Sequence, residues 1–336
     1  MAFDSRLSEM RASVIVLNWN GRPHLELCLP ALVAQTFQDF ETIVVDNASS
    51  RDDSLDFVRS RFPSVRLVAL ETNLGFSGGN LAGVAVARGE FIVLLNNDTR
   101  PEPDWLEQLV ACAEAQPEVG IVAAHLTDWD GVFTDSAGDG CYVSGHGFKR
   151  HTGRPAAEAP ASGPCFGACG GAALYRRTMV EHAGFLDADF FLNYEDTDLS
   201  LRVRMLGGQC WFCREAVVRH RVSASQGECS PWNVFYGARN HVWVCAKNLP
   251  FWLLLKYSPV TVVTLVYMGW YAARRGRARD FLRGFAHGIG GLREQLRKRR
   301  ELQSKWRLSS RELEVQLTLP SWPRTMPRLF RRRAGE

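Results

Sequence analysis

The residues best suited to hold a charged ligand follow apolar segments of this chain. Residues 91–95 read FIVLL and lead directly into Asn96, Asn97 and Asp98. A buried strand that ends in a carboxylate places a hard oxygen ligand at the edge of an open α/β sheet. One carboxylate there can hold Mg²⁺ or Mn²⁺ against a diphosphate, because such ions take most of their ligands from phosphate and water. The same residue types favour turns, so this segment alone also fits a plain polar turn.

Two other apolar segments end in the same way. Residues 13–17, SVIVL, lead into Asn18 and Asn20, and residues 42–45, TIVV, lead into Asp46. Parallel strands of an open sheet bind their ligands beyond their carboxyl ends. We therefore expect all three polar ends to converge on one side of the sheet.

A glycine-rich segment, NLGFSGGN at residues 73–80, lies before the apolar segment that ends at Asn96. It matches neither the G-x-G-x-x-G dinucleotide fingerprint nor the lysine-containing phosphate loop. Backbone without side chains can approach a phosphate or a base closely, so Asn73, Gly75, Gly79 and Asn80 are candidate donor contacts. An ordinary turn that opens a helix explains the same composition.

Three carboxylates stand within four residues in the second half of the chain, at Glu195, Asp196 and Asp198. They open a helix predicted over residues 196–206. Packing like charges this closely is unfavourable unless amides, cations or the helix dipole compensate, and such a cluster suits a reaction that needs a base. Acids also favour the first turn of any helix, and Asp198 can pair with Arg202 four residues on. We assign Asp198 a structural role.

Three further features of the second half are candidate site elements. His220 ends a strand-like apolar stretch, where a histidine is either a packed residue or a metal ligand. Gly170 and Gly171 belong to a run of small residues that can form the wall of an acceptor and sugar pocket. Arg239, on a helix predicted over residues 232–247, either contacts phosphate or lies in solvent.

Strand and helix patterns alternate through the first 124 residues. The strands are predicted at residues 13–17, 42–45, 65–70, 91–95 and 119–124, and the helices at 23–35, 54–61, 81–87 and 103–115. Regular alternation builds βαβ units with right-handed crossovers. The predicted fold class is therefore α/β, with a mostly parallel, Rossmann-like sheet.

Six motifs carry a family resemblance. In chain order they read VIVLNWNG, VVDNASS, NLGFSGGN, LLNNDT, GACGGAALYRR and LNYEDTDLSLR. Together they resemble family-2 glycosyltransferases of the GT-A fold, and in particular the rhamnosyltransferase-like branch that builds bacterial surface polysaccharides. The resemblance covers residues 12–245 and implies an inverting transferase. Its implied donor is a nucleotide-diphosphate sugar of the dTDP or UDP type, and its implied cofactor is Mn²⁺ or Mg²⁺.

The resemblance also implies roles for single residues. Asp46 would accept a hydrogen bond from a pyrimidine base. Asp98 would ligate the metal, and His220 would reach the metal, as a second ligand, or the diphosphate. Asp196 would be the base, and Glu195 would orient the acceptor or a neighbouring donor. The remaining donor contacts would come from Asn18, Asn20, Asn96, Asn97 and the segment at residues 73–80. Many relatives carry Asp where this chain has Asn96, which leaves less charge to hold the metal.

The chain divides by charge into an acidic body and a basic end. Residues 274–336 hold 18 Lys and Arg against 6 Asp and Glu, and the rest of the chain holds 22 against 30. A basic end on an acidic body indicates an anionic partner surface. No recognised nucleic-acid-binding module accompanies the charge, so we expect a membrane and no nucleic acid.

The C-terminal region supports the membrane interpretation. Residues 249–273 are apolar apart from Lys256, but Pro259 interrupts them and the uncharged stretch is short for a span. Next comes an amphipathic pattern, which predicts either a helix lying on anionic lipid or one packed on the catalytic domain or a second subunit. Its apolar positions are Phe281, Phe285, Ile289, Leu292 and Leu296.

The predicted organisation has three parts. Residues 1–248 form the catalytic domain, with a nucleotide-binding half at 12–125 and an acceptor half at 126–248. Residues 249–303 associate with the membrane, peripherally or as a re-entrant segment, and residues 304–336 form a basic tail that we expect to be flexible. The N-terminus has no apolar stretch of signal-peptide length, and nine scattered cysteines suit a reducing cytoplasm.

The resulting hypothesis is an inverting glycosyltransferase on the cytoplasmic face of the bacterial inner membrane. It would move a sugar, rhamnose among the candidates, to a lipid-linked or polysaccharide acceptor. A nucleotidyltransferase acting on a sugar phosphate shares the sheet and the acidic metal site, but it does not explain the carboxylate cluster at residues 195–198. A degenerate, non-catalytic membrane scaffold is the second alternative, and homo-oligomers are compatible with all three.

Overall fold

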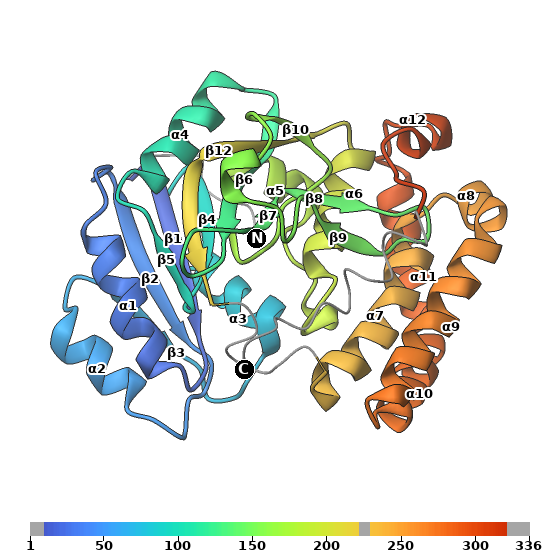
Figure 1. Ribbon diagram of the computed structural model, residues 1–336, viewed down its shortest axis with the longest axis horizontal. Coiled ribbons are helices and arrows are strands. Elements are labelled where there is room, and N and C mark those ends of the chain that lie inside the picture. The colour runs from blue at the N-terminus through green and yellow to red at the C-terminus, as the bar shows by residue number, and fades with distance from the viewer. Residues whose placement is uncertain (1–9, 222–228, 321–336) are drawn as a thin grey trace.

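A single ten-stranded mixed sheet forms the centre of the molecule, and helices cover both of its faces (Figure 1). The structure, a computed structural model, describes residues 10–221 and 229–320. The strand order is β10-β12-β6-β11-β4-β1-β2-β3, with β5 beside β12 and β7 beside β6. A separate two-stranded ribbon pairs β8 with β9.

The strands are short apart from β6 and β12. Their bounds are β1 Ala12–Asn18, β2 Phe40–Asp46, β3 Arg66–Ala69, β4 Phe91–Asn96, β5 Thr99–Pro101, β6 Val119–Thr127, β7 Thr134–Ala137, β8 Asp139–Cys141, β9 Gly147–Lys149, β10 Gly163–Cys165, β11 Ala172–Arg176 and β12 Gln209–His220.

The helices fall into a group around the sheet and a C-terminal group. Around the sheet lie α1 Arg22–Val33, α2 Ser54–Arg61, α3 Gly75–Val84, α4 Trp105–Ala115, α5 Arg177–Ala183 and α6 Glu195–Met205, with short 3-10 turns at Ala156–Glu158 and Ala188–Phe190. The C-terminal group comprises α7 Pro231–Asn248, α8 Phe251–Lys256, α9 Ser258–Arg274, α10 Ala278–Gly290, α11 Leu292–Gln303 and α12 Ser310–Glu314.

Two hydrophobic layers hold the helices to the sheet. Alternate residues of β1, β2 and β4 pack with α1, α2 and α4 on one face. The intervening residues of the same strands pack with α3, α5 and α6 on the other face. This alternation follows from the two-residue period of a strand, and it explains why these strands are apolar on both faces.

The sheet is more mixed than the alternating sequence predicts. β1 pairs in parallel with β2 and β4, and β2 with β3, as expected. The strand predicted at residues 119–124, β6, does not lie beside β4, because β11 inserts between them and runs antiparallel to both. The prediction of a mostly parallel sheet is therefore wrong for the second half of the chain. The sequence carries no local signal for the pairing of β4 with β11, which lies some 80 residues further along the chain.

The glycine-rich segment is a helix rather than a turn. α3 begins at Gly75, although its start was predicted at residue 81. A Cβ at Gly79 would lie 2.4 Å from Leu17 Cδ1, and one at Gly83 would lie 2.6 Å from Ile15 Cγ2. The glycines therefore let α3 approach β1 closely, and this packing outweighs their low helix propensity.

The C-terminal helices pack on the catalytic domain along α7 (Figure 1). A third core cluster joins Phe190 and Leu201 to Leu249, Leu253 and Leu313, which are fully buried. The boundary predicted after residue 248 is thus not a separation of two bodies. Residues 304–320, expected to be flexible, are held to the domain by α12 and by backbone hydrogen bonds of Thr318, and the rest of the predicted tail lies outside the described residues.

Two details of this region differ from the sequence interpretation. Pro259 does not interrupt α9 but occupies its first turn, where the missing N–H is harmless. Gly284 and Gly288 form the side of α10 that faces α7, while Leu282 and Ile289 stay exposed.

Within the described residues, no helix has the length and apolar character needed to cross a bilayer.

Candidate active site

The three polar strand ends meet at one edge of the sheet, as predicted. Asn18 and Asp46 are partners in the register of β1 and β2, and Asn18 Nδ2 donates to Asp46 Oδ1 over 3.1 Å. Asn97 Nδ2 donates to Asn18 Oδ1 over 2.8 Å. Asn20 steadies the neighbouring loop, since its side-chain oxygen accepts from the backbone N–H groups of Ser50 and Arg51.

Asn18 and Asn80 are buried and hydrogen-bonded within the protein, and the donor contacts predicted for them stay a prediction. Asn18 is 0% exposed and Asn80 is 1% exposed. Asn18 instead links Asp46 to Asn97, and Asn80 Nδ2 donates to the carbonyl of Phe76 one turn back in α3. Both side chains therefore hold neighbouring parts of this edge of the sheet in place through hydrogen bonds.

Asn47 is a site residue that the candidate list lacked. Its Nδ2 donates to Asn73 Oδ1 and to the carbonyl of Gly75, and its Oδ1 accepts from the N–H of Leu74. The side chain thus fixes the entry into α3 beside Asp46. Its position directly after an apolar strand was the available signal.

Gly75 and Gly79 serve packing. Gly75 has φ +71°, and a Cβ there would lie 2.4 Å from the carbonyl oxygen of Phe191. That oxygen accepts from the N–H groups of Phe76 and Ser77. The start of α3 is therefore docked against the segment that leads into the carboxylate cluster, and both glycines are buried. The donor contacts predicted for these two glycines stay a prediction.

Asp98 and His220 face each other across two strand ends. β12 pairs antiparallel with β5, and this register places His220 opposite Thr99. His220 Nε2 lies 3.5 Å from Asp98 Oδ1, and both side chains are buried. Asp98 Oδ1 has no hydrogen-bond partner within the described part of the chain. An orphaned carboxylate oxygen opposite an imidazole nitrogen is a donor set that suits Mn²⁺ or Mg²⁺.

Asp135 and Lys149, which the sequence did not single out, support this pair. Asp135 Oδ2 lies 2.9 Å from His220 Nδ1 and 2.8 Å from Lys149 Nζ. A carboxylate on the far nitrogen of a histidine sets its tautomer and orientation in metal sites. Burial alone would lower the pKa of His220, but Asp135 and Asp98 raise it to about 9, so a divalent cation would have to displace the proton on Nε2 before that nitrogen could ligate it. Lys149 and His220 hold the pKa of Asp135 well below its usual range despite burial.

Asp196 lies at the start of α6, where its carboxylate is partly exposed. Its Oδ1 accepts from the N–H of Thr197 over 2.7 Å. Burial raises the pKa of Asp196 against this hydrogen bond. Burial and the charge of Asp196 also raise the pKa of Glu195 to about 8, and Glu195 Oε2 has no partner among residues 10–221 and 229–320.

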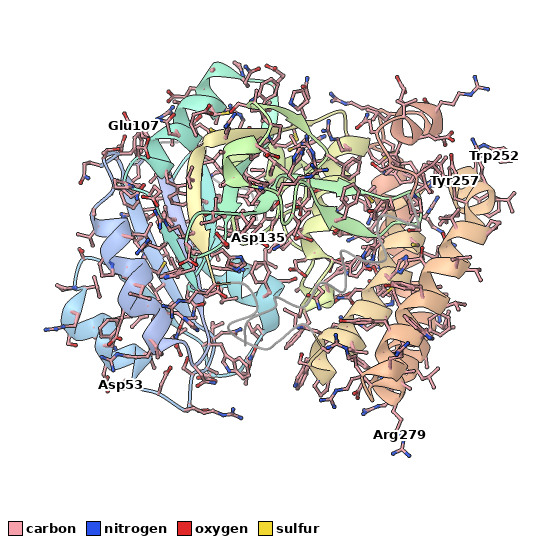
Figure 2. The ribbon with its side chains drawn as sticks, in the orientation of Figure 1. Asp53, Glu107, Asp135, Trp252, Tyr257 and Arg279 are labelled. Carbon is pink, nitrogen blue, oxygen red and sulfur yellow. The ribbon has the colours of Figure 1, made fainter. Side chains whose placement is uncertain are left out.

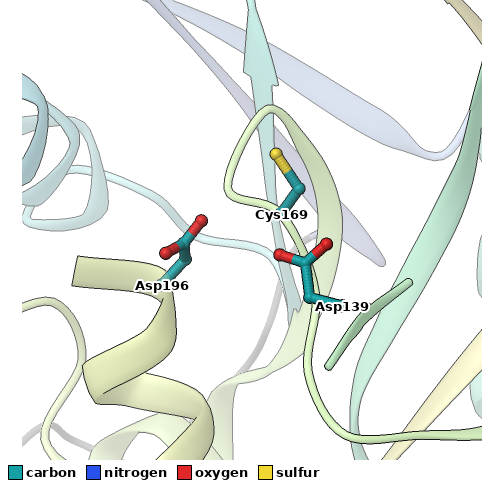
Figure 3. Close-up of side chains that lie close together, drawn as sticks. All are labelled: Asp139, Cys169 and Asp196. Atoms are coloured by element: carbon teal, nitrogen blue, oxygen red, sulfur yellow. The ribbon is translucent and has the colours of Figure 1, made fainter. Parts of the chain in front are cut away.

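Asp139 and Cys169 lie beside Asp196, and the ligand atoms of the three residues are within 4.8 Å of one another (Figure 3). Asp139 comes from β8, and Cys169 comes from the loop before β11. Burial and the charge of Asp196 raise the pKa of Asp139 to about 7. Neither residue was predicted, because short irregular strands carry no periodic signal.

Gly170 and Gly171 lie between the two halves of the site. The carbonyl of Gly171 accepts from the N–H of Asn96 over 2.8 Å, and a Cβ at Gly171 would lie 3.2 Å from Asn96 Nδ2. A Cβ at Gly170 would lie 3.1 Å from the ring of Phe76. Small residues here let β11 bring the carboxylate cluster next to the strand ends.

Arg239 is held within the fold. Its Nη2 donates to the carbonyls of Asp189 and Phe190, and its guanidinium lies over the rings of Tyr236 and Trp243. These contacts tie α7 to the segment before α6. The phosphate contact predicted for Arg239 stays a prediction.

Asp198 has the structural role that we assigned to it. It is 0% exposed and accepts from Arg202, Lys247 and Asn248. The residue before α6 is Tyr194, whose φ is +71° and whose side chain makes no capping bond.

The comparison with known families agrees with this geometry. Residues 13–184, more than half of the chain, match the family model described as glycosyl transferase family 2. The chain belongs to glycosyl transferase family 2. The matched segment contains the strand ends and Asp98, and it stops before the carboxylate cluster of this family-2 glycosyltransferase.

Two curated relatives are similar to this family-2 glycosyltransferase at modest identity. The O-antigen biosynthesis protein RfbC of Myxococcus xanthus is 29% identical over 76% of this chain and 20% of its own length. The N-acetylglucosaminyl-diphospho-decaprenol L-rhamnosyltransferase of Mycobacterium tuberculosis is 26% identical over 64% of this chain and 77% of its own length. The chain spans a quarter or less of the length of the first two curated relatives it matches.

A solved structure supports the fold. The mannosyltransferase PcManGT of Pyrobaculum calidifontis, solved with GDP-Man and Mn²⁺, is similar with a TM-score of 0.54. Its sequence is 19% identical, and the match covers 88% of this chain and 86% of that one. The fold is thus GT-A-like α/β.

Proposed function

We propose that this family-2 glycosyltransferase is a cation-dependent inverting enzyme that transfers a sugar from a nucleotide-diphosphate donor. The donor we expect first is dTDP-rhamnose, and the acceptor is lipid-linked or polysaccharide, in bacterial cell-surface glycan synthesis. The observation that carries the proposal is the orphaned oxygen of Asp98 opposite His220, beside the strand end that holds Asp46. The similarity to a rhamnosyltransferase supports the choice of sugar.

The strand ends would bind the nucleotide and the cation. Asp46 would accept from the N–H of the base at the edge where β1 and β2 end. Asp98 and His220 would hold the divalent cation, which would neutralise the diphosphate as it departs. Asp135 and Lys149 keep His220 in place through the hydrogen bonds described above.

Asp196 supplies the base on the other side of the reacting carbon. A raised pKa gives a carboxylate a higher proton affinity, so it can take the proton of the acceptor hydroxyl as that oxygen attacks. The buried Glu195 next to it orients the acceptor. Inversion follows because the acceptor attacks from the face opposite the diphosphate.

The test combines a donor panel with metal titration. The purified protein is incubated with Mn²⁺ or Mg²⁺ and a set of nucleotide sugars, and binding of the nucleotide diphosphates is measured by calorimetry with and without metal. Asp98→Asn should abolish the metal-dependent part of nucleotide binding. Glu107→Gln, which changes an exposed carboxylate on α4 that lies well away from Asp135 in Figure 2, serves as the control.

Two results would refute the proposal. One is the absence of hydrolysis and transfer with every donor. The other is nucleotide affinity that does not depend on metal in either variant, which is the behaviour of a non-catalytic scaffold.

We also propose that helices α8 to α10 rest on an anionic membrane surface at the cytoplasmic face. Large exposed apolar side chains gather on these helices, and Trp252 and Arg279 lie on the same C-terminal side of the molecule (Figure 2). The apolar residues are Phe251, Trp252, Leu255, Val262, Val263, Val266, Trp270, Leu282 and Ile289. Exposed arginines adjoin them at residues 274, 275 and 279, which matches an anionic headgroup layer.

Vesicle binding tests the membrane proposal. Deleting residues from 249 onward is unsuitable, because Leu249 and Leu253 belong to a core cluster. The triple variant with Arg274, Arg275 and Arg279 changed to Gln should bind phosphatidylglycerol vesicles about a hundredfold more weakly, since each basic residue contributes about 1 kcal/mol.

The matched control removes three arginines at the other end of the molecule, Arg51, Arg59 and Arg61, which are also exposed. It should bind the vesicles like the wild type. Equal binding by both triple variants would rule out the surface on α8 to α10, and equal binding to phosphatidylcholine would rule out the role of charge.

A further inference from the structure

Trp232 is an exposed aromatic residue near the candidate active site. Its side chain is 54% exposed, although it belongs to α7, the helix along which the C-terminal group packs on the catalytic domain. The local sequence fixes its place, because Ser230 caps α7 by accepting from the N–H of Asn233 and Pro231 occupies the first turn. Trp232 therefore lies in the first turn of a capped helix.

Two neighbouring rings hold the indole of Trp232 in place. Tyr236, one turn further along α7, has its ring centroid 5.8 Å from that of Trp232. The ring of Phe191 lies 6.2 Å from Trp232 and 4.8 Å from Tyr236, and the planes of the three rings are within 17° to 23° of one another. Because the stack restricts the rotamers of the indole, little side-chain entropy remains to be lost when a ligand binds to it. The three rings form a rigid aromatic platform whose exposed part is Trp232.

The aromatic platform is joined to both parts of the candidate site. The carbonyl of Phe191 accepts from the N–H groups at the start of α3, beside the strand end that holds Asp46. Asn193 Nδ2 donates to Asn233 Oδ1 over 3.4 Å, which ties the first turn of α7 to the residues just before the carboxylate cluster. Phe191 and Asn193 have φ of +61° and +67°, a conformation that residues other than glycine rarely adopt. Such strain persists where surrounding contacts hold the backbone in place, and it gathers at binding sites.

The chemistry around Trp232 fits a sugar ring. One face of a pyranose presents C–H groups, which pack on the electron-rich face of an indole. The edge of the same ring carries hydroxyls, and polar side chains stand beside the platform to meet them, namely the amides of Asn193 and Asn233. An aliphatic lipid chain on this surface would cover those amides without forming hydrogen bonds to them, which is unfavourable.

We propose that Trp232 binds a pyranose ring of the acceptor, with Phe191 and Tyr236 as its supports. This inference rests on the proposed function, in which Asp196 takes the proton of an acceptor hydroxyl. It narrows the acceptor to a carbohydrate: the sugar is transferred to a hydroxyl of an existing glycan or glycolipid, and the phosphate of a bare lipid carrier is not the acceptor.

Saturation-transfer NMR with simple glycosides tests the inference without turnover. The full-length protein is mixed with dTDP, Mn²⁺ and one probe, which is methyl β-glucopyranoside, methyl N-acetyl-β-glucosaminide or methyl α-rhamnopyranoside. In the wild type, saturation should reach the ring C–H protons of one or more of these glycosides. Trp232→Leu removes the aromatic face but keeps an apolar side chain, so it should weaken that binding about tenfold, whereas Trp232→Tyr should retain most of it.

Phe62→Leu is the matched control. Phe62 also packs on another ring, with its centroid 5.6 Å from that of Phe57, but it directly follows α2, which lies on the opposite side of the molecule from α7 (Figure 1). This variant should bind the glycosides like the wild type. Melting temperatures are recorded for every variant, and Trp232→Gln replaces Trp232→Leu if the latter does not fold.

Three results would overturn the inference. The first is a wild type that transfers saturation to none of the glycosides, and the second is equal glycoside binding by Trp232→Leu and Phe62→Leu. The third is saturation of geranyl phosphate, used as a lipid probe, that exceeds that of every glycoside and is abolished in Trp232→Leu.

Turnover gives a second measurement that separates this inference from the proposed function. With an active donor and glycoside, Trp232→Leu should raise KM for the glycoside about tenfold and leave KM for the donor unchanged. The metal-dependent nucleotide affinity should also stay unchanged, since Trp232 is not part of the Asp98 and His220 pair. If no donor is turned over, the proposed function fails, while the NMR measurement still decides whether Trp232 binds a sugar ring.

Discussion

The sharpest prediction on stability concerns the buried carboxylate Asp198. It is fully enclosed and accepts from Arg202 Nε at 2.8 Å, Lys247 Nζ at 3.0 Å and Asn248 Nδ2 at 2.7 Å. Asp198→Asn keeps the volume but leaves two cations, each about 4% exposed or less, without this counter-charge. Removing one partner of a buried ion pair destabilises a protein by about 3–5 kcal/mol.

The remaining partners place the effect within that range. Lys247 retains Asp187 at 2.7 Å, and Arg202 retains backbone carbonyls of Ala183 and Phe185. We therefore expect a loss near 3 kcal/mol, which for a domain of this size lowers the melting temperature by about 6–12 °C. Urea unfolding followed by both circular dichroism and tryptophan fluorescence measures the free energy and checks that the two probes coincide.

The control is Glu301→Gln, which breaks an exposed pair with Arg297. Exposed pairs contribute less than about 1 kcal/mol, so this variant should unfold nearly like the wild type. If Asp198→Asn unfolded at the same urea concentration as Glu301→Gln, the ion pairs around Asp198 would not stabilise the fold. The assignment of Asp198 to a structural rather than a catalytic role would then lose its basis.

Two further predictions concern pH and backbone conformation. Asp198 and Asp187 have pKa values lowered by their cations, against burial, so their contribution is complete above the unfolded pKa near 4 and is lost as the pH falls through the folded pKa values. The urea midpoint of the wild type should accordingly drop between pH 5 and pH 3, and that of Asp198→Asn should drop less. Gly75→Ala should lower the melting temperature more than Gly153→Ala: both glycines have φ above +70°, but only the Cβ at Gly75 would meet a backbone atom, the carbonyl oxygen of Phe191 at 2.4 Å. Equal losses in the two variants would show that left-handed backbone strain of about 1 kcal/mol is the whole effect.

The sequence by itself determined the elements whose residues interact locally. The strands ending at Asn18, Asp46 and Asn96 lie within a few residues of their predicted bounds, because apolar runs closed by polar residues are a local signal. The convergence of these ends followed from the parallel pairing of β1, β2 and β4. The family motifs then pointed to Asp98, Asp196 and His220.

Only the tertiary structure decided the pairings between distant segments. β11 enters the sheet between β4 and β6, and this insertion brings Gly171 beside Asn96. Asp135, Asp139 and Lys149 come from short strands without periodicity, so no local pattern distinguished them from other polar residues.

The glycines of residues 73–80 also show that the local sequence and the packing of distant segments decide different properties. In the segment 73–80 they suggested an open turn, whereas in the structure Gly75 and Gly79 are buried in α3, where a Cβ at Gly79 would collide with Leu17 of β1 and a Cβ at Gly75 with Phe191. Helix propensity is a property of the local chain, but the space available to a side chain depends on which distant residues pack against it. For that reason the sequence located the polar strand ends and the carboxylate cluster, and the structure decided which distant residues pack around them.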